Sequence, residues 1–466
     1  MGTVINSEDA KKTDKSNRLT GKRIKGRINR KEIKEGREKM KEVLYKTVHH
    51  FFPDLRGWLK GMKDPRFKEM TTYELPVVIW EGLLLFLLKL GSRRQINYEL
   101  RSEEMVNNVR LLTKEELERL PHDGTLAYLL GRLDPEELSV VRTKMVKSLI
   151  RKRCLERYRL RGYYLVAIDG SGCLTFKEKH CERCLKVEKD GKVLYYKHPV
   201  LEAKLVTENG LAFSLGTEFI ENRDAKVKVQ DCELKAFYRL AEKIKKDFPQ
   251  LNICLLLDGL YANGPVIEIC NRNHWKYITT FKEGSMPERY REYESLKKSN
   301  PENRGKYEKD GTKQEYYWAM DVLQYDGIPN ANVMECIETK KGKEKRFVWL
   351  TNFLVSEHSY REIGGGGRLR WKIENEGFNM QKNGVYNLEH PYSKSLRALK
   401  NFYLLLQIAH IISQLMEKSS LLAEAVLGSI RNLSRRLLES LRSSSFNPGD
   451  LEIIESARFQ IRLLPP

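Results

Sequence analysis

The chain has 466 residues, of which 41% are hydrophobic and 32% charged, a balance that supports a packed core and excludes a disordered or collagen-like chain. Its 84 Lys and Arg exceed its 63 Asp and Glu by 21, and this surplus indicates a polyanionic partner such as nucleic acid. No apolar run reaches the ~20 residues of a bilayer span, and the Lys-rich N-terminus does not resemble a secretory signal. We therefore expect a cytoplasmic protein with no membrane segment and with eight reduced cysteines.

The first third of the chain predicts a basic arm followed by helices. Positive charges recur throughout residues 1–45, as in an arm that lies on phosphates. Residues 46–160 have helical patterns, and the apolar run 75–90 predicts a buried helix. A Thr-x-x-Glu capping box predicts a helix that begins at Thr113, and Asp134 before a proline predicts the start of another.

Strands and helices alternate in the middle of the chain, which predicts an α/β core. Two of the expected strands end in Asp-Gly pairs that predict turns, at Asp169 and at Asp258. A hairpin is predicted around residues 208–210. The expected strands are 163–168, 195–207, 211–220, 253–257 and 277–281, and the expected helices are 231–248 and 267–273.

The last third predicts a mostly β insertion and then further helices. The insertion has three strand-like runs, and the four glycines at 364–367 predict a loop before a long helix over 368–383. An apolar helix is expected over 396–418, followed by a helical C-terminus with a basic face. The strands expected in the insertion are 316–321, 333–338 and 347–351.

Three acidic residues and one arginine form the set with the strongest chemical meaning. Asp169 and Asp258 follow apolar strands, at the sheet edge where open α/β sheets bind ligands, although Asp-Gly is also an ordinary turn. Arg370 and Glu374 are four residues apart and share one face of a helix, as a surface ion pair also would. Carboxylates are the ligands that Mg²⁺ prefers, and two such ions with an arginine suit phosphodiester chemistry.

The segments 167–170, 256–262 and 370–378 resemble the DDE transposases of bacterial insertion sequences. They are most similar to the cut-and-paste group whose third motif is Tyr-x2-Arg-x3-Glu-x6-Lys, and the resemblance covers about residues 160–415. It implies an RNase H-like core, two Mg²⁺ ions with Mn²⁺ as a substitute, and cleavage and strand transfer at terminal inverted repeats. It also implies double-stranded DNA partners, both transposon ends and target, and a homodimer in the synaptic complex.

Matched by position, the resemblance implies that Asp169, Asp258 and Glu374 are the catalytic metal ligands and that Arg370 contacts DNA phosphate. Glu376 is the alternative third ligand, and the Trp-x-Ile-Glu spacing favours Glu374.

Two positions depart from the third motif. Gly367 stands where the motif has tyrosine, and Gln381 stands where it has lysine. In a regular α-helix Gln381 returns to the face of Glu374, whereas Lys382 lies about 80° from that face. Because its side chain is long, we assign the phosphate contact to Lys382.

A Cys-x2-Cys pair, Cys181 and Cys184, follows His180, with Cys173 and His198 nearby. A structural zinc needs four ligands, of which the pair supplies two. The sequence therefore leaves two interpretations, a zinc site or a hairpin loop with reduced thiols, and favours the second.

The expected fold class is α/β, with an RNase H-like catalytic core, a mostly β insertion, and helical N-terminal and C-terminal regions. The expected function is a nucleoid-associated, Mg²⁺-dependent DNA transposase, an endonuclease and polynucleotidyl transferase. Two alternatives remain, a catalytically inactive transposase-derived DNA-binding protein and an RNase H-fold nuclease without strand transfer. The expected segments are a basic arm (1–45), a DNA-end-binding region (46–160), the core (161–284 and 351–418), the insertion (285–350) and a C-terminal region (419–466).

Overall fold

The computed structural model describes residues 40–222, 229–323, 328–384, 386–423, 430–457 and 460–464. The basic arm expected over 1–45 lies outside these ranges, except for residues 40–45, which begin a helix. Within the described ranges, no helix combines the length and the apolar character that crossing a membrane requires.

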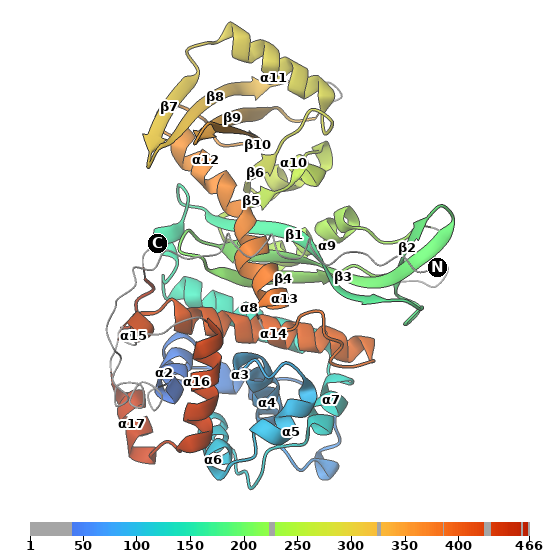
Figure 1. Cartoon of the computed structure of the whole chain (residues 1–466), viewed down its shortest axis with the longest axis vertical. Coiled ribbons are helices and arrows are strands. Elements are labelled where there is room, and N and C mark those ends of the chain that lie inside the picture. The colour runs from blue at the N-terminus through green and yellow to red at the C-terminus, as the bar shows by residue number, and fades with distance from the viewer. Residues whose placement is uncertain are drawn as a thin grey trace, which may run out of the picture.

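A mixed sheet of ten strands forms the centre of the described molecule (Figure 1). The strand order is β2-β3-β1-β5-β6-β10-β9-β8-β7, and β4 pairs with β3 beside this path. The pairs β1–β5 and β5–β6 are parallel, and the others are antiparallel. The strands are β1 (Tyr164–Phe176), β2 (Leu185–Lys189), β3 (Lys192–Val206), β4 (Ala212–Phe219), β5 (Ile253–Leu257), β6 (Lys276–Thr280), β7 (Arg304–Lys309), β8 (Thr312–Val322), β9 (Ala331–Lys340) and β10 (Lys343–Thr351).

The predicted β insertion extends this sheet. Its last strand, β10, pairs with β6 through Trp349 opposite Thr280, and β9, β8 and β7 follow outward. The insertion also contains a helix that the sequence analysis did not predict, α11 (Pro287–Ser299), which packs on β8. Because β10 covers the edge of β6, the core and the insertion share one continuous set of backbone hydrogen bonds.

The strand register determines which residues face which helices. Gly216 on β4 lies under α9 (Glu233–Asp247), because a Cβ there would be 3.0 Å from Leu240. The opposite face of the sheet carries α8 (Pro135–Arg151), the helical segment α12–α13, and α14 (Leu396–Glu417). Figure 1 shows the orange α12–α13 segment crossing this face from the insertion towards α14. Helix α10 (Gly264–Arg272) joins β5 to β6.

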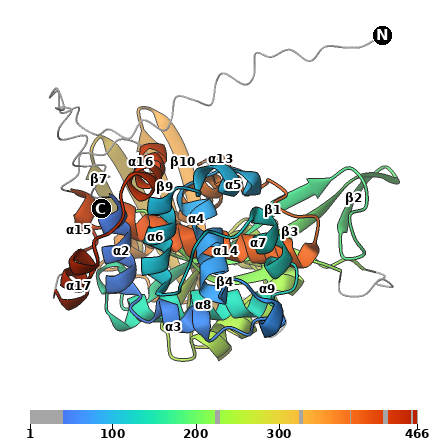
Figure 2. The same ribbon diagram turned by 90° about the horizontal axis from the view of Figure 1, so that it is seen from below.

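The N-terminal and C-terminal helices pack together into one helical layer below the sheet (Figures 1 and 2). At its centre is α4 (Leu75–Leu87), whose thirteen residues are all buried and which lies against α14. The Asn108 side chain donates hydrogen bonds to the carbonyls of Leu441 and Ser444, and so joins the two ends of the chain. The other helices of this layer are α2 (Met40–Phe51), α3 (Leu55–Lys60), α5 (Ile96–Glu99), α6 (Glu103–Thr113), α7 (Asp123–Leu130), α15 (Ser420–Ala423), α16 (Ile430–Ser443) and α17 (Pro448–Ser456).

Several predictions from local sequence signals are confirmed. The buried helix predicted over 75–90 is α4, and Asp134 caps α8 by accepting a hydrogen bond from the backbone N–H of Glu136. Strands β3 and β4 form the predicted hairpin, with Gly210 in a left-handed conformation at its turn. These elements depend on contiguous apolar residues or on one capping or turn residue, which a short window of sequence contains.

Two predicted boundaries are wrong. Thr113 ends helix α6, and its hydroxyl donates back to the carbonyl of Val109 instead of capping a new helix. The turn predicted at Asp169 is absent, because β1 continues through this residue to Phe176 and pairs with β3. The long partner strand supplies hydrogen bonds that outweigh the local turn preference of Asp-Gly.

The loop predicted for the glycine run is also wrong, since all four glycines lie in α12 (Tyr360–Arg368). A Cβ at Gly364 would be 2.7 Å from Tyr316, and one at Gly367 would be 2.9 Å from Trp349 and from Ile278. The glycines therefore allow the helix to approach the sheet closely, and this packing offsets their low helix propensity.

We predict that Gly367→Ala lowers the free energy of unfolding by about 1–3 kcal/mol, because the added methyl group overpacks the contact with β6 and β10. Gly365→Ala is the matched control, since Gly365 is exposed on the same helix with no atom within 4 Å of a Cβ. It should raise the free energy of unfolding by up to about 1 kcal/mol. Urea denaturation measures both, and equal effects would contradict the close-packing explanation.

Candidate active site

The pairing of β1 with β5 places two of the predicted aspartates side by side. In this parallel pair Ala167 lies opposite Leu256, so Asp169, within β1, and Asp258, just after the end of β5, are each two residues beyond this pair and lie side by side. Both side chains then point to the face that carries α12–α13. Asp258 also accepts a hydrogen bond from the backbone N–H of Leu260 at 2.9 Å, which holds its carboxylate at the turn after β5.

Asp169 is half-buried among other carboxylates. The guanidinium of Arg370 lies 3.5 Å from its Oδ2 and favours ionisation. Burial nevertheless raises the pKa of Asp169 to about 6; Arg370 opposes this rise, and the negative charges of Glu233, Asp258 and Glu374 add to it. The structure therefore brings the three predicted acids and Arg370 into one electrostatic environment with an excess of negative charge.

Glu374 lies on an irregular part of the helical segment after α12. Leu369–Trp371 form a 3₁₀ turn, Ile373–Asn379 form a π-helix, and Met380–Asn383 form α13. Glu374 is exposed. The alternative ligand Glu376 forms an ion pair with Lys372 at 3.3 Å and lies against Gly210. Of these two glutamates, only Glu374 is among the charges that act on Asp169. Short π-helices are frequent at functional sites.

The π-helix changes which residue shares the face of Glu374. The prediction that Gln381 lies on this face is wrong, because Gln381 is fully buried and donates to Gln407 at 2.9 Å. A π-helix advances about 80° per residue instead of 100°, so Lys382 returns to within roughly 20° of Glu374 and Gln381 lies roughly 120° away. Lys382 is partly exposed and forms an ion pair with Glu389 at 3.1 Å.

Glu233 and Tyr261 are neighbours of the site that the sequence analysis did not assign to it. The Tyr261 hydroxyl donates to Glu233 at 2.7 Å, and this carboxylate lies against Gly170, where a Cβ would be 2.5 Å away. Glu233 is the acidic residue of the first turn of α9. Asp231 instead pairs with Arg239 at 2.6 Å. The position of Tyr261, three residues after Asp258, is the sequence signal that could have indicated the contact.

The donor set at this site fits a hard divalent cation. Asp169, Asp258 and Glu374 supply only carboxylate oxygens, the ligands that Mg²⁺ and Mn²⁺ prefer. Burial and the neighbouring carboxylates raise the pKa of Asp169, and the charge of Arg370 opposes this rise. A bound divalent ion would stabilise the ionised carboxylate further and relieve the repulsion among the acids.

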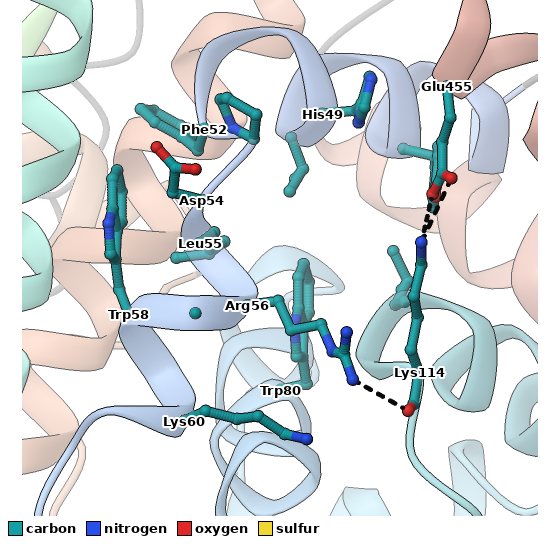
Figure 3. A pocket seen from close by; sticks show the side chains of 15 residues that line it. His49, Phe52, Asp54, Leu55, Arg56, Trp58, Lys60, Trp80, Lys114 and Glu455 are labelled. Carbon is teal, nitrogen blue, oxygen red and sulfur yellow. Dashed lines mark hydrogen bonds and ion pairs between the residues drawn. The ribbon is translucent and has the colours of Figure 1, made fainter.

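A separate hollow of about 440 Å³ lies in the helical layer (Figure 3). Its lysines and its arginine have partners: Lys114 lies 3.0 Å from Glu455, Lys60 lies 2.8 Å from Glu115, and Arg56 donates to the carbonyl of Thr113 at 2.8 Å. Among the described residues that line it, we find no group of converging acids comparable to that around Asp169.

Fold and site together define a mixed α/β protein with an acidic cluster at the carboxyl end of β5, beside the parallel strand β1, which continues past it. No family model and no curated protein sequence matches the chain. Among solved structures, it is similar to a piggyBac transposase determined by cryo-EM in a synaptic complex with hairpin DNA. The match covers 86% of this chain and 80% of that chain, with 11% sequence identity and a TM-score of 0.38. The likeness is distant, and the function proposed below depends on the residues of this chain.

We predict that Asp169→Asn stabilises the metal-free protein at pH 8. The pKa of Asp169 in the folded state, about 6, exceeds its ordinary value of 3.8, so the native state loses stability as the pH rises through this window. The variant should therefore exceed the wild type by on the order of 1–2 kcal/mol at pH 8 and match it at pH 4. Urea denaturation in EDTA measures the difference.

Asp231→Asn is the matched control for this experiment. Burial raises the pKa of Asp231, but the hydrogen bonds and charge of Arg239 together with backbone N–H donors lower it below its ordinary value, so its charge stabilises the fold above that pKa. This variant should lose stability at pH 8. A destabilised Asp169→Asn variant at pH 8 would contradict the electrostatic description of the site.

Proposed function

We propose that the chain is a DDE-type DNA transposase that cleaves and joins DNA at the terminal inverted repeats of an insertion sequence. The observation that carries this proposal is that Asp258 and Glu374, both far from Asp169 in sequence, lie near enough for their charges to act on this half-buried residue, which also pairs with Arg370. Each of these residues also lies in a segment that resembles a motif of the family.

The strand arrangement supports the same class. The order β4-β3-β1-β5-β6, with three antiparallel strands followed by two parallel ones, is the order that we expect of an RNase H-like core and so supports this proposal. In this arrangement Asp169 on the first strand lies beside Asp258, which follows the strand parallel to it, so the two carboxylates are available to one ligand.

Each side chain has a distinct role in the proposed reaction. Asp169, Asp258 and Glu374 would hold two Mg²⁺ ions, which activate the attacking oxygen and stabilise the leaving oxygen of an in-line phosphodiester displacement when bound. Arg370, now 3.5 Å from Asp169, would contact the scissile phosphate and fix its orientation. Lys382, on the face of Glu374, would bind a neighbouring phosphate and keep the strand in register.

The charge of the whole chain fits a DNA substrate. A surplus of 21 positive charges supports binding to phosphates through counterion release, with affinity that falls steeply as salt increases. We assign the DNA ends to the helical layer and the basic arm, and the dimeric synaptic complex to two copies of this chain.

We predict that Glu374→Gln abolishes Mg²⁺-dependent cleavage while DNA-end binding is retained. Losing one carboxylate ligand removes several kcal/mol of transition-state stabilisation, which corresponds to a decrease in the cleavage rate of about 10³-fold. The substrate is a supercoiled plasmid carrying the two sequences that flank the reading frame, and the products are separated on gels.

Glu376→Gln is the matched control for cleavage, since Glu376 pairs with Lys372 and lies against Gly210 at the β3–β4 turn. It should cleave at nearly the wild-type rate. Nicking without joined products would support the nuclease alternative, and retardation without cleavage by the wild type would support the inactive DNA-binding protein. Either result would overturn the proposed strand transfer.

We also predict that Lys382→Ala weakens DNA-end binding several-fold and reduces the slope of log K against log salt by about one, as expected for one lost phosphate contact. Gln381→Ala should leave this slope unchanged and lower the free energy of unfolding, because the Gln381 amide is hydrogen-bonded in the core. Salt titrations by fluorescence anisotropy separate the two effects. A changed slope for Gln381→Ala alone would refute the π-helix assignment.

A further inference from the structure

Four sulfur and nitrogen side chains converge at the base of the β2–β3 hairpin. His180, Cys181 and Cys184 lie in the segment before β2, and His198 lies on β3. One ligand atom from each can be chosen such that all four lie within 4.8 Å of one another. The sequence offered Cys173 as a further candidate, but its side chain lies outside the part of the chain that the structure describes.

The distances among three of these atoms are those of a tetrahedral metal site. The Sγ atoms of Cys181 and Cys184 are 3.7 Å apart, and His198 Nε2 is 3.3 Å from the first and 3.2 Å from the second. Tetrahedral zinc, with Zn–S of about 2.3 Å and Zn–N of about 2.0–2.1 Å, separates two sulfurs by about 3.8 Å and a sulfur from a nitrogen by about 3.6 Å. The three atoms thus surround a space of the right size for one ion.

Hydrogen bonding alone accounts poorly for this arrangement. One imidazole nitrogen faces two sulfurs and carries at most one proton, so it cannot donate to both with good geometry. The Nδ1 atom of His180 is buried and has no hydrogen-bond partner among the described residues. The backbone N–H of Cys181 donates to Cys184 Sγ at 3.3 Å, a contact that stabilises a thiolate.

We propose that His180, Cys181, Cys184 and His198 bind one structural Zn²⁺ ion. Two thiolates and two imidazoles are a frequent zinc ligand set, and four protein ligands leave no open position for catalysis. This reverses the preference for a metal-free loop that the Cys-x2-Cys pair alone supported. The proposal is independent of the transposase assignment.

The surroundings explain why an ion would be needed here. Figures 1 and 2 show the β2–β3 hairpin projecting from the body of the molecule, and β2 is mostly exposed. A hairpin without its own core is marginally stable, and a metal crosslink between its base and a neighbouring segment compensates for the missing apolar contacts. Phe176 stacks on the ring of His180 with centroids 4.4 Å apart and shields the cluster on one side.

The crosslink lies on the strand pair that carries the acidic site. His198 is opposite Leu174 on β1, and in the same ladder Glu202 is opposite Asp169. The side chain of Asn222, beyond β4, donates to the carbonyl of Cys184 at 3.0 Å and joins the cluster to a third strand. The ion would therefore fix the end of β1 distal to Asp169 and orient the hairpin relative to the site.

The first experiment measures metal in the full chain purified without chelator. We expect about one zinc per chain by mass spectrometry of the metal, and release of that zinc when a mercurial reagent blocks the thiols. Replacement by Co²⁺ should give the visible bands of a tetrahedral site together with a thiolate charge-transfer band. Wild-type protein that binds neither Zn²⁺ nor Co²⁺, or a Co²⁺ spectrum of an octahedral site, would overturn the proposal.

Variants identify the ligands. Cys184→Ser and His198→Ala should lose most of the zinc, whereas His198→Cys should retain it, because three cysteines and one histidine also form a zinc site. Cys232→Ser is the matched control, since Cys232 is an exposed free cysteine outside the cluster, and it should bind zinc as the wild type does. Equal zinc in all four variants would place the metal elsewhere and refute the assignment.

Chelation of the wild type covers the case in which a variant fails to fold. Removing zinc should lower Tm and increase proteolytic cleavage within the hairpin, and adding Zn²⁺ back should reverse both changes. An unchanged Tm after complete removal, or a thiol titration that shows a Cys181–Cys184 disulfide in the purified protein, would refute a structural zinc.

Discussion

The register between β1 and β5 is the constraint on which the site depends. Backbone hydrogen bonds, not side-chain attraction, place Asp169 in β1 beside Asp258 at the end of β5, and the like charges there oppose folding. A shift of one residue would turn one carboxylate to the face that carries α9. The buried apolar strand β5 therefore stabilises an arrangement that is electrostatically unfavourable without a cation, as is common where function and stability compete.

The third carboxylate depends on helix irregularity. Glycines let α12 approach the sheet, and the π-helix that follows rotates the segment so that Glu374 is exposed while Gln381 enters the core. A regular helix over the same residues would place Gln381 on the face of Glu374 and turn Lys382 away. The extra residue in the π turn therefore accounts for a lysine one position later than the motif has it.

The sequence predicted elements whose determinants are local and contiguous. The all-buried α4, the apolar β5 and the Asp134 cap need only a short window. The features that were predicted wrongly depend on partners far along the chain. Gly367 lies in a helix that packs so closely on Trp349 and Ile278 that no side chain would fit, and this packing offsets the low helix propensity of glycine. Hydrogen-bond spacing within a helix has no reliable sequence pattern, so the π-helix was beyond prediction.

The candidate metal ligands and their neighbours also divide into residues that a short sequence segment predicts and residues whose placement depends on distant partners. Asp169, Asp258 and Glu374 were predicted because each lies in a short segment with a family likeness, and in the folded chain the charges of Asp258 and Glu374 add to the rise that burial causes in the pKa of Asp169. Glu233 could not be found in this way, since its contact with Tyr261 joins the start of a helix to the turn after a strand. In the proposed zinc cluster, the pair Cys181 and Cys184 could be recognised in the sequence because of its short spacing. The position of His198 depends instead on the pairing of β3 with β1.

The position of α12 has a mechanical consequence. At one end its glycines lie directly on side chains of β8 and β10, and at the other the same unbroken helical segment carries Glu374. Because no loop separates these ends, the segment acts as a strut between the outer strands and the acidic cluster. A load on the insertion, such as a bound macromolecule that bends the sheet, would be transmitted along this strut and would displace Glu374 relative to the two aspartates that the β1–β5 pairing holds side by side.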